Sequence, residues 1–225
     1  MRAMSSSPQA WPEDACAQRV LATRPLGAID RGLEDRTLDS LAEALARGER
    51  EVLQRLADAA LSLCGAQSAG ISLIELDNGA SIFRWHAVAG RWSGYLMGFM
   101  PRKASPCGVV VDRHAPQLMA NPELYFPEMN KAEPLAEEAL LVPFDVLGET
   151  VGTVWVVSHD PSVKFAAEHL RVMQRLANFA AAAYLVRATL AQSLEAREEL
   201  TRANDRLNRE NERLRARLAE QPVAR

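Results

Sequence analysis

The segment from Glu138 to Asp160, EALLVPFDVLGETVGTVWVVSHD, places the strongest constraint on how this chain can fold. Two apolar runs, Leu140 to Val146 and Val151 to Val157, flank the short sequence Leu147-Gly148-Glu149, and the second run is rich in β-branched residues. Two such runs separated by turn residues predict a β-hairpin. A long helical pattern begins at about Ala166, so the chain is expected to combine a sheet with a long helix.

Size and composition fit a globular protein. The chain has 225 residues, 48% of them hydrophobic, and a net charge of -3, so no basic field suggests a nucleic-acid or membrane partner. Its longest apolar run, Phe179 to Val186, is too short to cross a bilayer. The three cysteines, Cys16, Cys64 and Cys107, form no Cys-x-x-Cys pair, which argues against a zinc ribbon or a disulfide framework. We expect a cytoplasmic protein without a metal site.

The first part of the chain is expected to contain a leader followed by helices. Serines and prolines break any periodic pattern in residues 1–32, which we interpret as a flexible leader. Ser40 and Glu43 have the spacing of a capping box, and Leu41 belongs to a first helical stripe. A second helical stripe runs from Val52 to Leu63.

Two strands are predicted next, from Ala69 to Leu76 and from Ser81 to Val88, because apolar and polar residues alternate there. The sequence Asp77-Asn78-Gly79 between them is a strong turn signal, so these strands should form a second hairpin.

An irregular segment separates the two predicted hairpins, between Gly90 and Glu137. It is expected to contain a short helix, Cys107 to Arg113, and a short strand, Gln117 to Ala120. Long irregular connections in a compact domain are usually functional or disordered, and the many aromatic residues of this one argue against disorder. We therefore expect the segment to cover one face of the sheet as the wall of a binding site.

The C-terminal helix carries a heptad pattern. With leucines at position d and asparagines at position a, Glu210 at g and Arg215 at the following e would pair between parallel helices. The seam is weak at Ser193 and Arg197. Residues 186–225 are therefore predicted to form a parallel coiled coil in a homodimer. The predicted interface consists of Val186, Leu190, Leu200, Asn204, Leu207, Asn211, Leu214 and Leu218.

Three sequence motifs, SPCGVVVDRHAP, EALLVPF and VGTVWVVSHD, follow one another in an order that resembles a GAF domain. The resemblance is to the GAF domains of bacterial sensor histidine kinases in particular, and it covers about Asp39 to Leu185. It implies an α+β fold with a central antiparallel sheet of five or six strands, helices on one face and a small-molecule pocket on the other. It also implies dimerisation through the terminal helices. We assign residues 33–185 to this sensory domain.

The chain departs from sensor kinases after this region. No phosphoacceptor helix or ATP-binding domain follows the long helix, and all four histidines lie within the GAF-like region. These are His86, His114, His159 and His169. We expect signalling to a separate protein, such as a histidine kinase of a two-component system, unless the sequence is part of a longer sensor.

Candidate ligand-binding residues lie in the irregular segment and in the strand before it. Cys107 is placed near a helix N-terminus, where the helix dipole would lower its thiol pKa, unless it is a small buried residue. Arg113 could bind a carboxylate or phosphate or form an ion pair with Asp112. The aromatic residues could line a pocket or fill the core, and Trp155 is expected in the core. The predicted site consists of Trp85, Trp92, Phe99, Cys107, Asp112, Arg113, Met119, Tyr125 and Phe126.

Enzymatic and cofactor-based alternatives find less support. The free methionine sulfoxide reductases, a GAF branch, have a similar Cys-Gly step, but residues 121–137 contain no cysteine for the attacking thiol. Cys107 lacks the following histidine that phytochromes place at their bilin attachment site. Haem would need an axial ligand such as His86 or His114. We expect no enzymatic activity, and the sequence identifies no cofactor.

These inferences combine into one predicted function, a regulatory module that senses a small molecule or a redox state. A ligand, or a change at the Cys107 thiol, would alter the packing of the irregular segment, and the coiled coil would report the change to a partner. The alternative is a structural dimerisation or adaptor protein whose pocket is filled by its own side chains.

Overall fold

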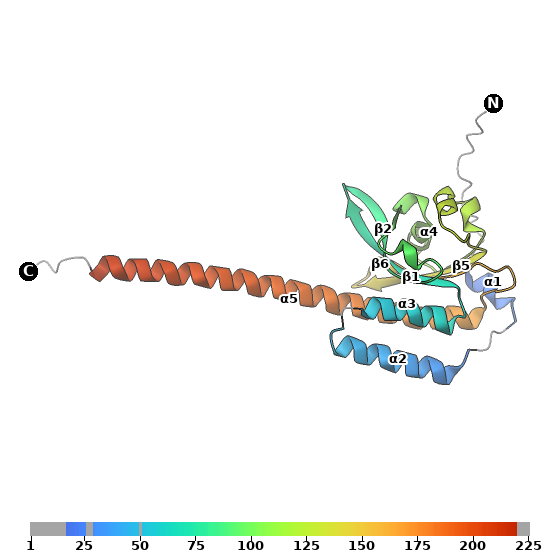
Figure 1. Cartoon of the computed structure of the whole chain (residues 1–225), viewed down its shortest axis with the longest axis horizontal. Helices are drawn as coiled ribbons and strands as arrows, with labels where there is room; N and C mark the ends of the chain where they lie inside the picture. The colour runs from blue at the N-terminus through green and yellow to red at the C-terminus, as the bar shows by residue number, and fades with distance from the viewer. Residues whose placement is uncertain (1–16, 26–28, 50, 220–225) are drawn as a thin grey trace, which may run out of the picture. The chain divides into compact units, whose positions relative to one another are not determined.

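The computed structural model describes residues 17–25, 29–49 and 51–219. The described residues fall into two compact units, one that ends at Ala183 and one that begins at Tyr184. The first unit contains a six-stranded sheet in the order β3-β2-β1-β6-β5-β4, and every neighbouring pair is antiparallel (Figure 1). This confirms the predicted α+β fold. The strands are β1 (Ser68–Asp77), β2 (Ala80–Gly90), β3 (Phe99–Pro101), β4 (Gln117–Ala120), β5 (Glu138–Val146) and β6 (Glu149–Ser158).

Both predicted hairpins are present, and each is closed by two residues with positive φ. Asn78 and Gly79 have φ of 49° and 81°, and Leu147 and Gly148 have φ of 53° and 87°. Two consecutive residues in this region match the tight turn whose twist suits a hairpin. Glu149, which we expected in the second turn, is the first residue of β6 and pairs with Val146.

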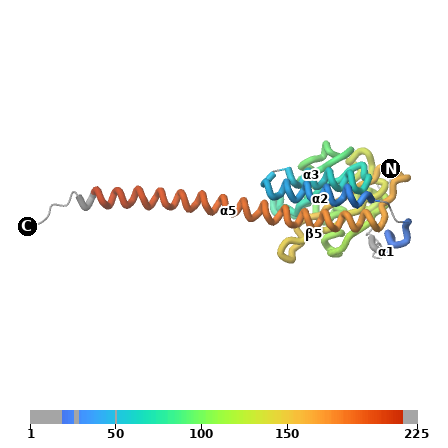
Figure 2. The backbone as a smooth tube through the Cα atoms, turned by 90° about the horizontal axis from the view of Figure 1, so that it is seen from below, coloured from blue at the N-terminus to red at the C-terminus, as the bar shows by residue number. Residues whose placement is uncertain are grey.

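Two helices, α3 (Val52–Leu63) and the first turns of α5 (Ala167–Ala219), cover one face of the sheet, and α2 (Arg31–Ala46) packs against α3 on the side away from the sheet (Figures 1 and 2). Glu34 on α2 is almost fully buried and accepts hydrogen bonds from Arg171 on α5, with Nη2 at 2.7 Å from Oε2. The guanidinium groups of Arg171 and Arg175 hold the pKa of Glu34 below its ordinary value.

The predicted capping box at Ser40 and Glu43 is wrong, because both residues lie inside α2. The helix begins earlier, at Arg31, and Asp30 is its N-cap, with a side chain that accepts a hydrogen bond from the Leu33 N–H at 3.1 Å. An aspartate at this position satisfies an N–H that the first helical turn leaves free.

Part of the expected flexible leader is helical. The helix α1 (Ala17–Ala22) packs beside the edge strand β4, and Leu21 is fully buried. Arg24 forms an ion pair with the buried Glu138 at the start of β5. Residues 1–16 and 26–28 of the expected leader lie outside the described residues.

The other face of the sheet is covered by residues 91–137, which we call the lid (Figure 1). The predicted short helix is present as α4 (Pro106–Arg113), and the predicted short strand is β4. Ser105 caps α4, because its Oγ accepts a hydrogen bond from the Gly108 N–H at 3.1 Å. Four 3-10 helices complete the lid: η1 (Ser93–Tyr95), η2 (Arg102–Ala104), η3 (Pro122–Leu124) and η4 (Pro127–Lys131).

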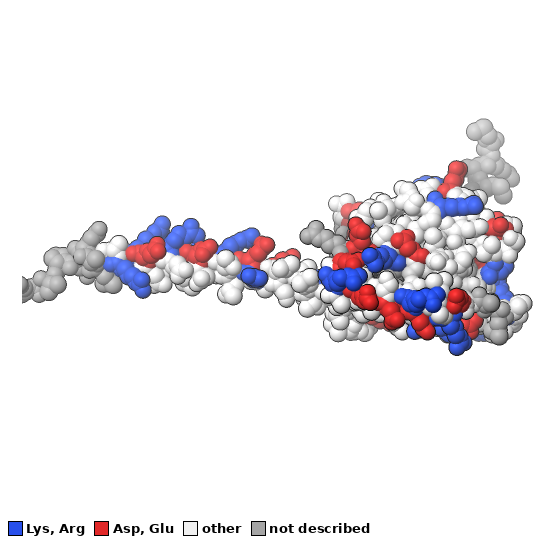
Figure 3. Space-filling model, turned by 60° about the horizontal axis from the view of Figure 1, so that its bottom comes forward, with Lys and Arg blue, Asp and Glu red and all other residues white. Residues whose placement is uncertain are grey.

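The second unit consists of the later part of α5. Its predicted seam residues are exposed, including Leu200 at 72%, Leu207 at 64% and Leu214 at 46%. Leu218 belongs to α5, but its side chain lies outside the described residues. Acidic and basic side chains alternate over the surface seen in Figure 3, and no single-sign patch dominates it. Among the described helices, none has both the length and the apolar character required to span a bilayer.

Candidate functional site

A small apolar cavity lies between the sheet and the lid. Its floor is formed by Ala139 and Leu141 of β5 and by Trp155 and Val157 of β6. Residues two apart on a strand share one face, which explains why each strand contributes an alternating pair. The cavity has a volume of ≈ 30 Å³, which is room for about one water molecule.

The walls and roof of the cavity come mainly from the lid. Pro106, Cys107, Met129 and Trp92 line the cavity from the lid, and Met100 lines it from the edge strand β3. Trp85 of β2 completes the lining. Apart from the thiol of Cys107, these side chains carry no ionisable group, so the cavity presents aromatic rings, aliphatic carbon and thioether sulfur.

Three tryptophan rings pack against one another at this cavity. The rings of Trp85 and Trp92 are parallel within 1°, with centroids 6.2 Å apart. The ring of Trp155 lies 5.9 Å from each of them at an interplanar angle of 60°. The backbone of Gly70 makes room for this arrangement, because a Cβ there would lie 2.3 Å from Cζ2 of Trp155.

Cys107 is held in a chain of buried hydrogen bonds beside the cavity. Thr153 Oγ1 donates to Sγ at 3.2 Å, Sγ lies 3.8 Å from Ser72 Oγ, and Ser72 Oγ accepts from the Trp155 indole N–H at 2.9 Å. Burial raises the pKa of the Cys107 thiol and outweighs these hydrogen bonds, which lower it. Of the two alternatives for Cys107, the structure therefore supports the small buried residue and not the thiol with a lowered pKa, and the thiol is protonated at neutral pH.

His159, at the end of β6, fastens the lid to the sheet. Because a carbonyl only accepts, Nδ1 must donate to the Leu135 carbonyl at 2.7 Å, and Nε2 then accepts from the Ser68 hydroxyl at 2.7 Å. The same hydroxyl oxygen accepts the Trp92 backbone N–H at 3.1 Å, and the imidazole packs on the Trp92 ring with centroids 5.1 Å apart. The Trp92 indole N–H donates to the Pro134 carbonyl at 2.9 Å.

Burial lowers the pKa of His159, with a smaller contribution from the charge of Arg91. The imidazole is therefore neutral at pH 7, in the form that accepts the hydrogen bond from Ser68. Sequence reasoning missed this histidine, because its partners lie far away along the chain.

Three of the nine predicted ligand-binding residues, Trp85, Trp92 and Cys107, line the cavity. Met119 and Phe126 are buried in the adjoining apolar core without reaching the cavity. Tyr125 is partly buried against the same core. The alternation within β5 and β6 was a signal that could have identified Leu141 and the other floor residues.

The remaining predicted residues face elsewhere. Phe99 is 53% exposed, with the Arg84 guanidinium 5.4 Å from its ring centroid. Asp112 forms an ion pair with Arg102. Arg113 Nη1 donates to Gln117 Oε1 at 3.1 Å. None of these side chains supplies a charge to the cavity.

The possible haem ligands also lie outside the cavity. His86 is paired with Glu75, and His114 Nε2 lies 3.2 Å from Asp145 Oδ2. Within the ranges that the structure describes, no group of three or more His, Cys, Asp or Glu side chains is arranged to hold a metal ion.

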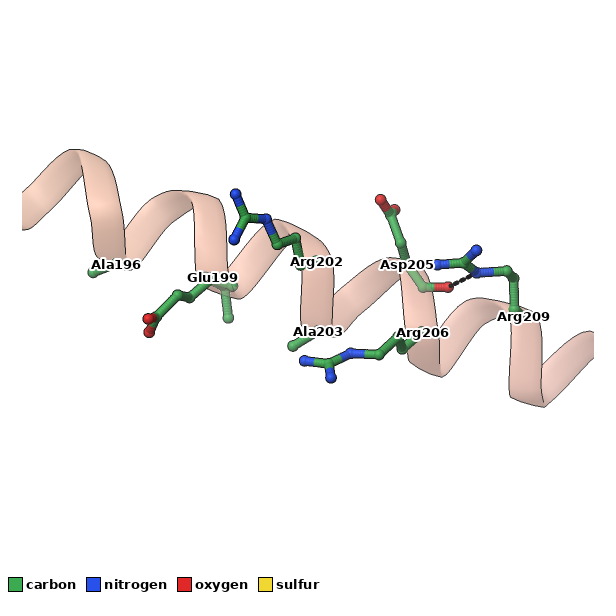
Figure 4. A pocket seen from close by; sticks show the side chains of 8 residues that line it. Ala196, Glu199, Arg202, Ala203, Asp205, Arg206 and Arg209 are labelled. Atoms are coloured by element: carbon green, nitrogen blue, oxygen red, sulfur yellow. Dashed lines mark hydrogen bonds between the residues drawn. The ribbon is translucent and has the colours of Figure 1, made fainter.

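A second hollow lies on α5 in the second unit, and all of its lining residues belong to this one helix (Figure 4). Ala196 and Ala203 lie on either side of Leu200 along the chain, and Arg209 Nε donates to the Asp205 carbonyl at 3.2 Å. A hollow bounded by one helix is an open surface, and this one includes Leu200 of the predicted seam.

Comparisons with known proteins agree with this architecture. The sequence model of the GAF domain family matches residues 46–184. A comparison with curated protein sequences gave no match.

Solved GAF structures share the fold at low sequence identity. The second GAF domain of DevS from Mycobacterium smegmatis is 21% identical, with a TM-score of 0.52 over 63% of this chain and 96% of that one. The phycoerythrobilin-bound GAF domain of a cyanobacterial phytochrome is 10% identical, with a TM-score of 0.59 over 74% and 100%. The free methionine-R-sulfoxide reductase of Neisseria meningitidis is 15% identical, with a TM-score of 0.58 over 74% and 97%.

Proposed function

Because this chain belongs to the GAF domain family, whose members are sensory and regulatory modules that bind small molecules, we propose that it senses a small molecule in the cavity beneath its lid. The observation that carries the proposal is the position of that cavity, between the lid and the sheet and lined by the three tryptophans, on the face of the sheet opposite α3. Apolar, concave sites with few polar groups are typical of ligand pockets.

A ligand must change the packing of the lid. The cavity of ≈ 30 Å³ is far smaller than the roughly 300 Å³ of a typical ligand pocket, so the bound form requires the lid to move outward. Outward movement of Pro134 and Leu135 would break the hydrogen bonds to Trp92 and His159. A ligand that binds the open form better than the closed form shifts the population between them.

The proposed output is a parallel coiled coil formed by α5 in a homodimer. The heptad register of the exposed seam extends back into the first unit, where Val172, Leu176 and Ala183 occupy the same positions and are buried. The weak seam at Ser193 and Arg197 is the proposed element with two arrangements.

We further propose that the protein acts in the cytoplasm, without enzymatic activity, on a separate signalling partner such as a histidine kinase. Two observations support a role without catalysis: the raised pKa of Cys107 and the lack of any cysteine in residues 121–137. The raised pKa also makes small-molecule sensing a better hypothesis than sensing through this thiol.

The sensing step can be tested by native mass spectrometry of the freshly purified full chain. A retained small molecule, released on denaturation, is the expected result. For the output, Ser193→Cys in a Cys16→Ser background should form an intermolecular disulfide at a rate that changes when the ligand is added. Leu214→Cys, placed on the strong part of the seam, is the control and should not respond. Equal rates with and without ligand would contradict the mechanism.

The small cavity also favours a second candidate, a structural adaptor whose pocket is filled by its own side chains. In that case the methionines and tryptophans at the cavity are permanent core, and the domain serves dimerisation and docking only. Native mass spectra without any adduct, together with an unchanged disulfide rate in the presence of cell metabolites, would support the adaptor.

A further inference from the structure

The chemistry of the cavity lining restricts which ligand it can hold. The lining contains tryptophan, methionine and aliphatic side chains, together with Cys107, and no carboxylate, guanidinium, ammonium or imidazole group. A charged ligand would lose its hydration without meeting a counter-charge, which is costly in an apolar site. The lining therefore disfavours phosphate, carboxylate and ammonium compounds.

The polar groups close to the cavity are already used. The indole N–H of Trp92 donates to the Pro134 carbonyl at 2.9 Å, and that of Trp155 donates to Ser72 Oγ at 2.9 Å. Thr153 donates to the sulfur of Cys107. If a ligand with many hydrogen-bonding groups entered the cavity, those groups of the ligand would find no partner. A ligand that offers mainly ring surface would have few such groups to leave unpaired.

The existing aromatic contacts favour a planar ligand over a saturated one. Trp155 contacts both Trp85 and Trp92 with ring centroids 5.9 Å apart, a separation typical of favourable aromatic pairs. An aromatic ligand can replace ring–ring contacts by contacts of the same kind. A saturated ligand of similar volume would lose them.

The roof of the cavity can adapt. Met129 of the lid is unbranched and flexible, so it can adopt other rotamers at small cost, and so can Met100 on the edge strand β3. A cavity of about 150 Å³ accepts benzene. The cavity here, ≈ 30 Å³, reaches that size only if such roof side chains move outward.

We propose that the cavity binds a neutral aromatic compound of one or two rings, packed against Trp92 and Trp155 beneath a displaced Met129. This inference rests on the proposed function, because it names the ligand class of the same cavity. It adds that the cavity excludes charged compounds and prefers aromatic compounds to saturated ones.

The test uses the full chain and four probes with one ring each: benzyl alcohol, benzoate, benzylamine and cyclohexylmethanol. Binding is measured at pH 7 by saturation-transfer NMR and calorimetry. We expect benzyl alcohol to bind at least ten times more tightly than the anion, the cation or the saturated ring. Met129→Ala enlarges the roof and should tighten benzyl alcohol binding about tenfold. Phe99→Ala, which removes an exposed aromatic ring outside the cavity, is the matched control and should leave binding unchanged.

Several results would overturn the proposal. It is wrong if a charged probe or cyclohexylmethanol binds as tightly as benzyl alcohol, or if no probe binds either the native protein or Met129→Ala. If Met129→Ala does not fold, the four probes on the native chain still decide. A retained charged molecule in native mass spectra would refute the ligand class and leave the sensing function standing. Spectra without an adduct and no probe binding would refute both.

Discussion

Arg24 and Glu138 are 114 residues apart and form a two-pronged ion pair, with Nη1 and Nη2 each 2.8 Å from a different carboxylate oxygen. Glu138 is 1% exposed and also accepts the Phe165 backbone N–H at 2.8 Å. Arg24 Nη1 donates to the Phe165 carbonyl at 2.7 Å. The pair thus joins the segment after α1 to the first residue of β5 and to the chain just before α5.

Removal of Arg24 should destabilise the protein strongly, because the buried Glu138 carboxylate then keeps only the more distant Lys164, with Nζ at 3.9 Å from Oε1, as a counter-charge. We expect Arg24→Ala to lower the free energy of unfolding by about 2–4 kcal/mol, slightly less than for a fully buried pair because Arg24 is partly exposed. Urea unfolding followed by circular dichroism measures this. Arg202→Ala breaks an ion pair with both partners exposed and should cost below about 0.5 kcal/mol. Similar losses in both variants would contradict the interpretation.

Gly70 should not tolerate a side chain. A Cβ there would lie 2.3 Å from Cζ2 of Trp155 and 2.5 Å from the Ala87 carbonyl oxygen, so Gly70→Ala should cost about 1–3 kcal/mol or more. The change should also alter tryptophan fluorescence, since it displaces Trp155. Gly94→Ala meets no atom within 4 Å and should change stability by only about 0.5 kcal/mol. Thermal unfolding of the two variants tests this prediction. Equal melting temperatures for Gly70→Ala and Gly94→Ala would refute it.

Acid should weaken the fold through two partly buried histidines, His159 and His169. The pKa of His159 is lowered in the folded state, so between this value and the ordinary value of about 6.5 the unfolded chain binds more protons. The contribution of His159 to the free energy of unfolding is therefore complete above the ordinary pKa. It is lost as the pH falls through the lowered pKa of the folded state. His169 acts in the same direction, also because of burial. His159→Asn should therefore reduce, without abolishing, the rise in stability between pH 5 and pH 7, measured by urea unfolding. If the free energy of unfolding of His159→Asn rose with pH as steeply as that of the native protein, His159 would not be a source of the pH dependence.

Cys107 should be unreactive in the native protein. Burial raises its pKa, and burial raises the pKa of Cys64 to about 12, so neither thiol is ionised near neutral pH. In a Cys16→Ser background, we expect Ellman's reagent to label both thiols at least a hundredfold more slowly than it labels free cysteine. Labelling should become rapid in denaturant. Fast labelling of one native thiol, mapped to Cys107 by mass spectrometry, would restore the redox-sensing hypothesis.

The proposed dimer should depend on the leucine seam of α5. Leu207→Glu places a charge at position d and should weaken dimerisation at least a hundredfold in sedimentation equilibrium. Ala216→Glu introduces the same charge at position f, on the outer surface of the proposed coiled coil, and should leave the dimer intact. A native protein that is monomeric at micromolar concentration would contradict the proposal, as would equal behaviour of the two variants.

Much of the architecture could be predicted because local sequence controls it. Asn78-Gly79 and the Leu147-Gly148 step allow consecutive residues with positive φ, which determines where each hairpin turns. Helical periodicity indicated α3 and the course of α5, and these predictions were confirmed. The start of α2 was missed, because Ser40 and Glu43 have the spacing of a capping box although both lie inside the helix, whose N-cap is Asp30.

The binding site could be predicted only in part. Aromatic clustering identified Trp85 and Trp92, but Trp155 was expected to be ordinary core and forms part of the cavity floor. Arg113 and Asp112 were plausible ligand contacts from their chemistry alone, yet α4 directs them away from the cavity. Composition could not decide which side of a short helix would face the sheet.

The sequence by itself therefore determined the turns, the periodic helices and the family, because these depend on residues close together in the chain. Only the tertiary structure decided that Arg24 meets Glu138, that His159 fastens the lid and that Cys107 is protonated. The physical reason is that desolvation and long-range hydrogen bonding depend on which distant side chains exclude water from a group. That information exists only once the chain has folded.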